Sequence, residues 1–261
     1  MLHALWLYRG FLFSSVKRDF RSRYLQSLLG SLWNVVHPAA LVLVYTLVFA
    51  NVMSARLPGA SDPLAYGIYL CAGLFAWNYF AEIVARLQNV FLESANLLKK
   101  SSFPRICLPV ATLLSASVNF AIIFSLFLVF LAVSGRFPGL LVFAVLPVLV
   151  LQTAFAFGLG ILTGTLNVFL RDIGQAMAIL LQFWFWLTPI VYPIAVLPEA
   201  VRSALAWNPM FGAVKAYQDI FVAQVMPDYT TLWPLAAVTA VLLVIGFFAF
   251  RRLAPDVIDE L

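Results

Sequence analysis

Charged residues are scarce in this sequence. Asp, Glu, Lys and Arg make up 10% of its 261 residues, whereas an average soluble protein contains about 25%. Apolar residues make up 64%, which is more than a soluble fold of this length can hide from water. The composition therefore excludes an ordinary soluble protein and predicts an integral membrane protein. Because no hydrophilic stretch is long enough for a soluble domain, we expect a single membrane domain over residues 1–261.

The chain also lacks the residues that several kinds of chemistry require. Its two cysteines, Cys71 and Cys107, fall near opposite membrane faces in the topology below, so no disulfide is expected. Its two histidines, His3 and His37, have no metal-ligand spacing, and we expect no metal site. The patterns G-x-x-x-x-G-K-[ST] and G-x-S-x-G are both missing. We therefore expect no catalytic residues here and no ATP hydrolysis by a phosphate-binding loop.

Six long stretches between successive charged residues contain no charge: Arg23 to Arg56, Asp62 to Glu82, Arg105 to Arg136, Arg136 to Arg171, Asp172 to Glu199 and Asp228 to Arg251. Each can hold a spanning helix of about 20 residues, and a helix satisfies its own backbone groups in hydrocarbon. We place the spans near 31–54, 64–88, 109–133, 140–166, 175–193 and 230–250. The predicted fold class is an all-α integral membrane protein. An interfacial helix in 1–30 precedes six transmembrane helices across 31–250, and a cytoplasmic tail follows at 251–261.

Lys and Arg are unevenly shared between the two sides of this topology. One side holds Arg9, Lys17, Arg18, Arg21, Arg23, Lys99, Lys100, Arg105, Arg171, Arg251 and Arg252. The other side holds Arg56, Arg136, Arg202 and Lys215, and Arg86 lies near the inner end of the second span. Since basic residues accumulate on the cytoplasmic side, we expect both termini in the cytoplasm.

The segment from Leu12 to Leu28 has an amphipathic pattern. At about 100° per residue, one stripe contains Leu12, Phe13, Val16, Phe20, Tyr24 and Leu28. The other face holds Lys17, Arg18, Asp19 and Arg21, while Arg23 intrudes on the stripe. This pattern predicts a helix lying in the membrane interface. The helix is either a basic anchor for the first span or a platform that also contacts a cytoplasmic partner.

A short cytoplasmic connection, "FLESANLLKKSSFPRICLP" (Phe91–Pro109), has helix signals of its own. Lys99 and Lys100 suit a helix C-terminus, and Pro104 then breaks the helix. Leu97 and Leu98 allow two interpretations. They are a docking knob offered to a cytoplasmic partner, or they pack on the underside of the protein itself.

The outer segment from Thr188 to Gln224 is too apolar for an ordinary loop. Its prolines divide it into pieces too short to span, which predicts two short helices that dip into the outer leaflet. Asn208 is a good N-cap, and Pro209 suits the first turn of the second helix. Irregular backbone at membrane depth is tolerated only where it is buried or lines a cavity. We therefore expect this segment to close or line a pathway.

Two features inside the spans also leave alternatives open. Glu82 and Arg86 lie four residues apart, so they form a self-neutralising ion pair or belong to a functional site. Aromatic residues make up 15% of the chain and are dense in Leu74–Phe80 and Gln182–Pro193. Interfacial belts and helix packing account for many of them. Alternatively, they line a tunnel in which a sugar chain slides, because stacking contributes only about 1 kcal/mol per ring pair.

Four stretches, in order along nearly the whole chain, resemble the permease subunit of ABC-type polysaccharide exporters, which export O-antigen, capsular polysaccharide or teichoic acid. They are "YLQSLLGSLWNVVHPAALVLVYTLVFANVM" (Tyr24–Met53), "LLKKSSFPRICLPV" (Leu97–Val110), "NVFLRDIGQ" (Asn167–Gln175) and "WNPMFGAVKAYQDIF" (Trp207–Phe221). The resemblance implies a homodimer around a channel, in the bacterial inner membrane. It also implies two copies of a cytoplasmic ATPase that bind ATP and Mg, no cofactor in this chain, and a polysaccharide on a polyprenyl-diphosphate lipid as substrate.

The resemblance also implies roles for individual residues. ATPase coupling falls to Glu93, Asn96, Leu97, Leu98, Lys99 and Lys100. Contact with the lipid diphosphate falls to Arg18, Arg21 and Arg23, since Arg pairs well with phosphate. Candidates for the glycan channel are Trp33, Tyr45, Phe49, Phe183, Trp184, Trp186 and Tyr192. The outer gate lies in 195–221 and includes Trp207, Asn208, Pro209 and Phe211.

Three other functions compete with polysaccharide export. An exporter of drugs or lipids would share the fold, but the aromatic content and compact outer region favour a carbohydrate. A membrane-embedded enzyme acting on lipid-linked sugars needs clustered catalytic residues, which the sequence does not offer. A non-catalytic scaffold would have no evident use for the outer helices.

Overall fold

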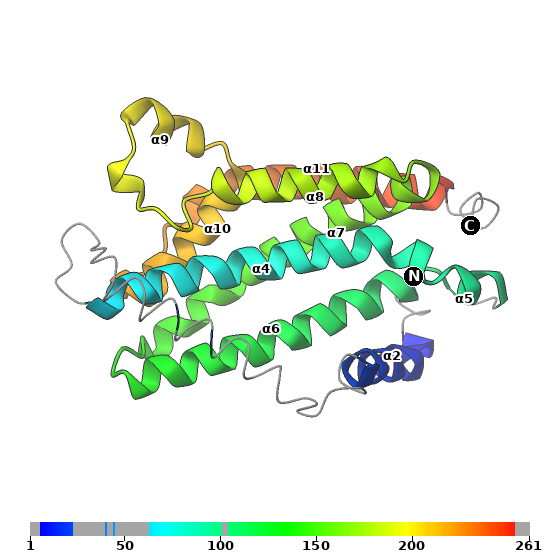
Figure 1. The fold of residues 1–261 in the computed structure, drawn as a ribbon, viewed down its shortest axis with the longest axis horizontal. Coiled ribbons are helices and arrows are strands. Elements are labelled where there is room, and N and C mark those ends of the chain that lie inside the picture. Colours follow the sequence, from blue (N-terminus) through cyan, green and yellow to red (C-terminus); the bar gives the residue numbers. More distant parts are fainter. Residues whose placement is uncertain (1–5, 23–39, 41–43, 45–62, 101–103, 254–261) are drawn as a thin grey trace.

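The computed structural model describes residues 6–22, 40, 44, 63–100 and 104–253. Their regular secondary structure is helical, with no strand in these ranges (Figure 1). The α-helices are α2 (Arg9–Ser22), α4 (Pro63–Glu93), α5 (Ala95–Lys100), α6 (Cys107–Val133), α7 (Val145–Phe169), α8 (Asp172–Trp186), α9 (Glu199–Leu205), α10 (Pro209–Gln218) and α11 (Trp233–Leu253). Shorter turns are η3 (Gly139–Ala144), η4 (Ile194–Val196), η5 (Asp219–Ala223) and η6 (Tyr229–Leu232).

Within the described residues, four helical segments are long and apolar enough to cross a membrane. They are Leu64–Glu93, Cys107–Val133, Gly139–Phe169 and Tyr229–Leu253. These segments confirm helices over the predicted spans 64–88, 109–133, 140–166 and 230–250. The predicted span 31–54 lies outside the described residues, apart from two isolated positions.

The predicted span 175–193 differs from the structure at its outer end. Helix α8 ends at Trp186, and the chain then runs through turns to Pro193. Its 15 residues rise about 1.5 Å each, so α8 falls short of the roughly 30 Å hydrocarbon core. Pro189 accounts for the early end, because proline has no N–H to donate and restricts the residue before it.

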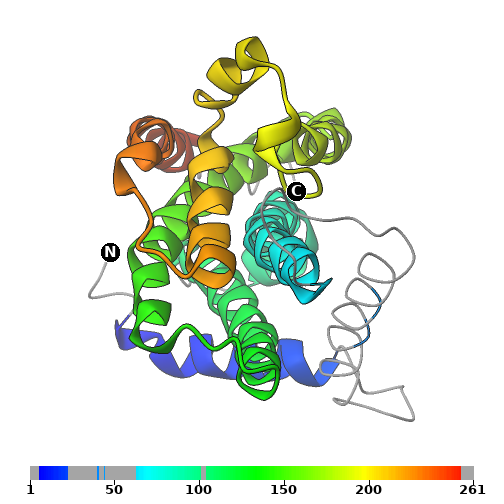
Figure 2. The same ribbon diagram turned by 90° about the vertical axis from the view of Figure 1, so that its left-hand side faces the viewer.

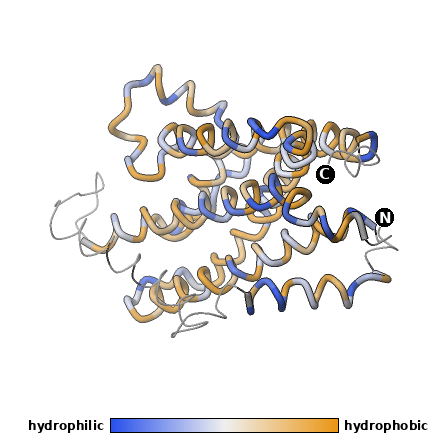
Figure 3. Tube along the Cα trace, turned by 45° about the vertical axis from the view of Figure 1, so that its right-hand side comes forward, coloured by the Kyte–Doolittle hydropathy of each residue, from blue (hydrophilic) through white to orange (hydrophobic). Residues whose placement is uncertain are grey.

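The long helices run side by side along the long axis of the molecule (Figure 1). Helix α5, the turn between α7 and α8, and the C-terminal end of α11 lie at one end, and α9 lies at the other. Helix α2 lies across the bundle at a steep angle (Figure 2). Hydrophobic residues dominate the long helices, whereas hydrophilic residues recur along α2 (Figure 3). This orientation and this composition are expected for an interfacial helix next to a bundle of spanning helices.

Helix α4 forms the centre of the bundle. It packs against α6, α7, α8 and α10, and it is the most buried of the four long segments. Its crossing with α7 depends on glycine. A Cβ on Gly164 would lie 2.4 Å from the carbonyl oxygen of Leu87, and one on Gly160 would lie 2.6 Å from Leu87 Cβ. Only glycine permits this approach of the two backbones.

The outer segment forms two helices with different surroundings. Helix α9 projects beyond the end of the bundle (Figure 1), whereas most side chains of α10 are buried inside it. The predicted start of the second helix is confirmed: Asn208 is the N-cap of α10, and its side chain accepts a hydrogen bond from the Met210 amide. Helix α10 is therefore part of the bundle, whereas α9 is not.

Candidate functional site

An ion-pair network joins three helices towards the end of the bundle that carries α5. The guanidinium of Arg86 on α4 lies 2.8 Å from the carboxylate of Asp19 on α2 and 3.4 Å from that of Glu82. Asn119 on α6 donates a hydrogen bond of 2.8 Å to the other oxygen of Glu82. All three charged side chains are partly buried, with 22–29% of their area exposed. The predicted Glu82–Arg86 pair is thus present, and it extends to the interfacial helix.

The basic face of α2 points away from this network. Lys17, Arg18 and Arg21 are exposed, so the two described arginines proposed for the lipid diphosphate are available to a ligand. Arg23 lies outside the described residues. Phe13, from the predicted apolar stripe, is also exposed, as a lipid-facing side chain of an interfacial helix would be.

Helix α5 is held to the end of the bundle by one of its two leucines. Leu98 is 4% exposed and packs in a cluster with Phe91 of α4 and Phe250 of α11. Leu97 is half-buried at the edge of that cluster, whereas Glu93 and Asn96 are exposed. The structure therefore separates the predicted coupling residues. Leu98 positions α5, Glu93 and Asn96 are exposed, and the side chains of Lys99 and Lys100 lie outside the described ones.

A polar clamp fixes the turn between α7 and α8 to the C-terminal end of α4. The Asn167 side-chain amide donates to the Gln88 carbonyl at 3.0 Å, and its oxygen accepts from the Gly174 amide at 2.9 Å. Gln88 in turn donates to the Gly174 carbonyl at 3.1 Å. Asn167 and Gln88 are buried, where such bonds resist replacement by water. These bonds therefore hold the start of α8 against the end of α4, which leads directly into α5.

The aromatic residues of α8 divide between two faces. Trp184 points into the subunit, where its ring lies edge-on to those of Phe80 and Phe155, at 5.4 Å and 6.0 Å between centroids. Phe183 and Trp186 point outward, with exposed fractions of 66% and 58%. Of the channel residues predicted on α8, only these last two face away from the subunit. Trp33, Tyr45 and Phe49 lie outside the described residues.

Asn208 connects the predicted channel to the predicted gate. Its side-chain oxygen accepts a 2.8 Å hydrogen bond from the indole N–H of Trp184. Its amide nitrogen donates to Thr188 Oγ1 at 3.1 Å and to the Leu187 carbonyl at 3.2 Å. One side chain therefore caps α10, orients Trp184 and binds the chain just beyond the end of α8.

Three side chains hold the irregular segment that follows α8. The hydroxyl of Tyr69 lies 3.1 Å from the Pro189 carbonyl and 3.0 Å from that of Tyr192. Gln218 on α10 donates to the same Pro189 carbonyl at 3.1 Å, and Tyr66 donates to the Val191 carbonyl. Since these carbonyls have no helix partner, the bonds satisfy backbone that would otherwise be costly at membrane depth.

The remaining predicted gate residues have separate environments. Phe211 is buried in the bundle, whereas the exposed Trp207 packs edge-on against Trp233 of α11 at 5.1 Å between centroids. Next to this pair, Asp228 accepts hydrogen bonds from the hydroxyl and amide of Thr230 at 2.7 Å and 2.9 Å. These bonds lower the pKa of the Asp228 carboxyl, so it stays ionised at the start of η6.

The sequence predicted neither a disulfide nor a metal site. Cys71 and Cys107 are both free and buried. Within the described ranges, no three His, Cys, Asp or Glu side chains come together as metal ligands.

Sequence reasoning did not identify the residues that brace the site. Asp19, Asn119, Gln88, Tyr69 and Gln218 each bridge positions far apart in the chain, and no local spacing reveals such partners. Asn167 and Gly174 lie within Asn167–Gln175, one of the four stretches that carry the family resemblance. The available signal was Asn167 itself, a polar residue close before the charged pair Arg171 and Asp172.

Comparison with known proteins gives a family match along most of the chain. A family model described as ABC-2 type transporter matches residues 11–222. The O-antigen export system permease protein RfbA of Myxococcus xanthus is 34% identical over 245 residues, which is 93% of this chain and 92% of that protein. The RfbA protein of Klebsiella pneumoniae is 29% identical over 249 residues, 94% of this chain and 93% of that protein. The polysialic acid transport protein KpsM of Escherichia coli is 23% identical, with 90% of each chain covered.

Proposed function

This chain belongs to the ABC-2 type transporter family, and we propose that it is the permease subunit of an exporter that moves a lipid-linked polysaccharide across the inner membrane. The observation that carries the proposal is the match to O-antigen export permeases over more than nine-tenths of both chains. A transport family, four apolar helices and the absent phosphate-binding loop agree with a multi-pass membrane protein that is not an enzyme.

The proposed topology has six spans with both termini in the cytoplasm. It is supported by the four long helices, by the apolar α8 and by the uncharged stretch 31–54. The exposed basic residues of α2, Arg171, and Arg251 and Arg252 of α11 lie at the end of the bundle that carries α5. Basic residues favour the cytoplasmic side.

The proposed export path runs between two copies of this chain. Phe183 and Trp186 give α8 an exposed aromatic face, and a second copy would enclose it in a channel. An aromatic lining suits a sliding glycan, because each ring offers a weak contact of about 1 kcal/mol without one fixed geometry. Arg18 and Arg21 are proposed to meet the lipid diphosphate as it approaches from the inner headgroup region.

The proposed motor is a separate ATPase, which binds ATP and Mg. In each half of the dimer it contacts Glu93 at the end of α4 and Asn96 on α5, and it displaces α2 and α5 relative to the spans. The Asp19–Arg86 ion pair passes this movement from α2 to α4. The Asn167 clamp passes it from the end of α4 to the start of α8. At the outer end, Asn208 and its bond to Trp184 hold the path closed until α8 moves.

Co-purification with the ATPase, followed by measurement of its hydrolysis, tests this function. We expect the complex to contain equal numbers of both subunits and its hydrolysis to rise when the lipid-linked glycan is added. Stimulation by a drug or a simple phospholipid, with none by the glycan, would instead assign the chain to another class of exporter. Substitution of Leu97, Leu98, Lys99 and Lys100 together tests the coupling role: export should stop while the ATPase stays bound.

A further inference from the structure

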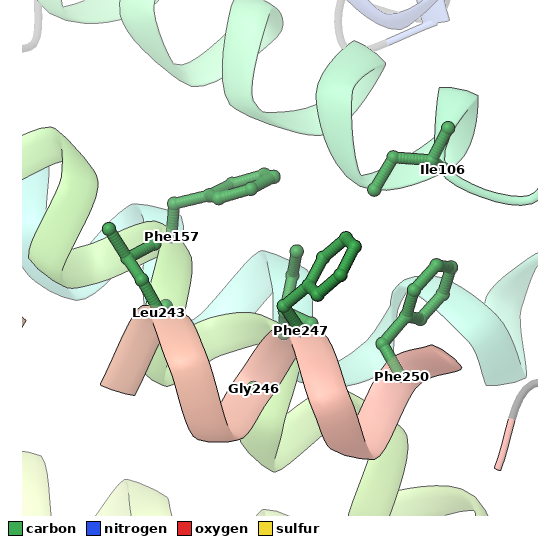
Figure 4. A pocket seen from close by; sticks show the side chains of 8 residues that line it. Ile106, Phe157, Leu243, Gly246, Phe247 and Phe250 are labelled. Carbon is green, nitrogen blue, oxygen red and sulfur yellow. The ribbon is translucent and has the colours of Figure 1, made fainter. Parts of the chain in front are cut away.

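An apolar cavity lies between α11, α7 and the inner end of α6, away from the export path. It has a volume of about 290 Å³. Its walls include Ile106, Phe157, Ile161, Leu243, Phe247 and Phe250. Figure 4 shows Phe247 and Phe250 of α11 turned towards Ile106, with Phe157 on the far side. No residue that lines the cavity is polar, so it suits hydrocarbon better than water.

The crossing of α7 and α11 explains why this space is open. A Cβ on Gly246 would lie 2.9 Å from the Gly158 carbonyl oxygen, so the two backbones touch at this point. Both glycines line the cavity and add no side chain to fill it. Phe247 is exposed and Leu243 is partly exposed beside the cavity, so the space opens towards the lipid-facing surface of α11.

Three arginines flank this cavity in the chain. Arg105 directly precedes Ile106, and Arg251 and Arg252 directly follow Phe250. Arg251 is four residues after Phe247, and residues four apart share one face of a helix. Arg251 and Arg252 are exposed, and Arg105 is half-buried. The chain therefore places positive charge where an apolar tail in the cavity would emerge at the membrane surface.

We propose that this cavity is a binding site for an anionic membrane phospholipid. One acyl chain occupies the cavity, and the phosphate of the head group binds the arginines at positions 105, 251 and 252. Basic pockets between spanning helices on the cytoplasmic side suit anionic head groups, and the guanidinium fork matches phosphate oxygens. The bound lipid bridges the ends of α6 and α11, next to Leu108 and Phe250 of the cluster that holds α5.

The location favours a resident phospholipid over the exported lipid. Helices α11 (orange to red) and α8 (yellow-green) lie on opposite flanks of the bundle in Figure 2. The cavity walls come from α6, α7 and α11 and not from α8. A polyprenyl-diphosphate substrate would have to leave this cavity and pass around the bundle to reach the aromatic face of α8.

Photo-cross-linking of the purified permease–ATPase complex tests the site. The probes are phosphatidylglycerol and phosphatidylcholine, each with a diazirine near the end of one acyl chain. We expect phosphatidylglycerol to label residues 243–250 and phosphatidylcholine to label them weakly. Substitution of all three arginines by Gln should lower the labelling about tenfold or more, since each basic residue contributes about 1 kcal/mol. The control is Arg171→Gln, an exposed arginine on the turn between α7 and α8.

Two further variants separate the site from general effects of charge. Ile106→Trp keeps every arginine and fills the cavity, so it should also abolish labelling. Replacement of the three arginines by Lys preserves the positive charge that orients the chain and should weaken labelling, because Lys lacks the guanidinium fork.

Several results would overturn the proposal. Equal labelling by both probes would make the cavity an ordinary lipid-facing groove, as would unchanged labelling of the Gln variant. Displacement of phosphatidylglycerol by an equimolar polyprenyl diphosphate would assign the cavity to the substrate. If the Gln variant does not purify, the contrast between the two probes on the unaltered complex decides the question alone.

Discussion

Arg86 on α4 and Asp19 on α2 form an ion pair of 2.8 Å that joins α2 to the central helix of the bundle. The two residues are 67 positions apart in the chain. Arg86 also contacts Glu82, which Asn119 of α6 holds in place. Under the proposed mechanism, a displacement of α2 would be transmitted to α4 and α6 through these partly buried polar contacts.

Loss of this ion pair should reduce export strongly, while it lowers the free energy of unfolding only slightly. In a double-mutant cycle, Asp19→Asn and Arg86→Gln should show a coupling energy of about 1 kcal/mol, because the pair is only partly shielded from solvent. Each single variant should export several-fold less glycan while the ATPase still co-purifies. Lys17→Gln, on the exposed face of α2, is the matched control. Additive effects on both stability and export would show that the pair has no coupling role.

The residues of α5 should separate into two classes. Leu98→Ala should lower the free energy of unfolding by about 2–4 kcal/mol, because it opens a cavity beside Phe91 and Phe250. Asn96→Ala, at an exposed position, should change stability by less than about 0.5 kcal/mol and weaken ATPase binding. Thermal denaturation and co-purification measure the two effects. If Asn96→Ala leaves ATPase binding intact, this face of α5 is not the contact surface.

The hydrogen bonds of Asn208 should matter for closure of the outer end. Asn208→Ala removes the cap of α10 together with the bonds to Trp184 and Thr188, and should cost about 1–2 kcal/mol of stability. Asn208→Asp keeps an acceptor for the Met210 amide and for Trp184, but it has no N–H for Thr188. We expect both variants to leak small ions in liposomes, Asn208→Ala more strongly. Tight liposomes with both variants would contradict a gating role for this residue.

The exposed aromatic residues of α8 should affect transport and leave folding unchanged. Phe183→Ala and Trp186→Ala should each reduce export or shorten the exported glycan, with denaturation midpoints close to that of the unaltered protein. Phe248→Ala is the matched control, because Phe248 is equally exposed on α11, which lies away from α8. Equal export by all three variants would show that the exposed face of α8 does not line the export path.

The close approach of α4 and α7 gives a prediction about stability alone. Gly164→Ala should destabilise the protein by more than about 2 kcal/mol, because its Cβ would meet the Leu87 carbonyl at 2.4 Å. The control is Gly10→Ala on α2, where nothing lies within 4 Å of the added Cβ. Alanine at that position should stabilise α2 by about 0.5–1 kcal/mol.

The sequence was sufficient to predict the parts of the fold that depend on local pattern. Uncharged stretches located the four long helices, and the Asn208–Pro209 pair marked the start of α10 because a cap acts within one turn. The early end of α8 was missed, although Pro189 was a visible signal. An apolar sequence continues past it to Pro193, and hydropathy does not reveal where a helix unwinds.

The bracing residues could not be predicted because their partners are set by packing. Tyr69 binds backbone carbonyls about 120 residues away, and Asn167 binds the end of α4 across the bundle. Leu97 and Leu98 were open to two interpretations for the same reason. Leu98 is inside because it packs in a cluster with side chains of α4, α6, α7 and α11, whereas Asn96 is exposed.

The most direct test measures glycan transport in liposomes that contain the purified permease, with and without its ATPase. With both subunits and ATP present, we expect a lipid-linked polysaccharide to cross the bilayer and to stimulate hydrolysis. With the permease alone, we expect neither transport nor any change in the glycolipid. Transport or modification of the glycolipid by the permease alone would contradict the central claim.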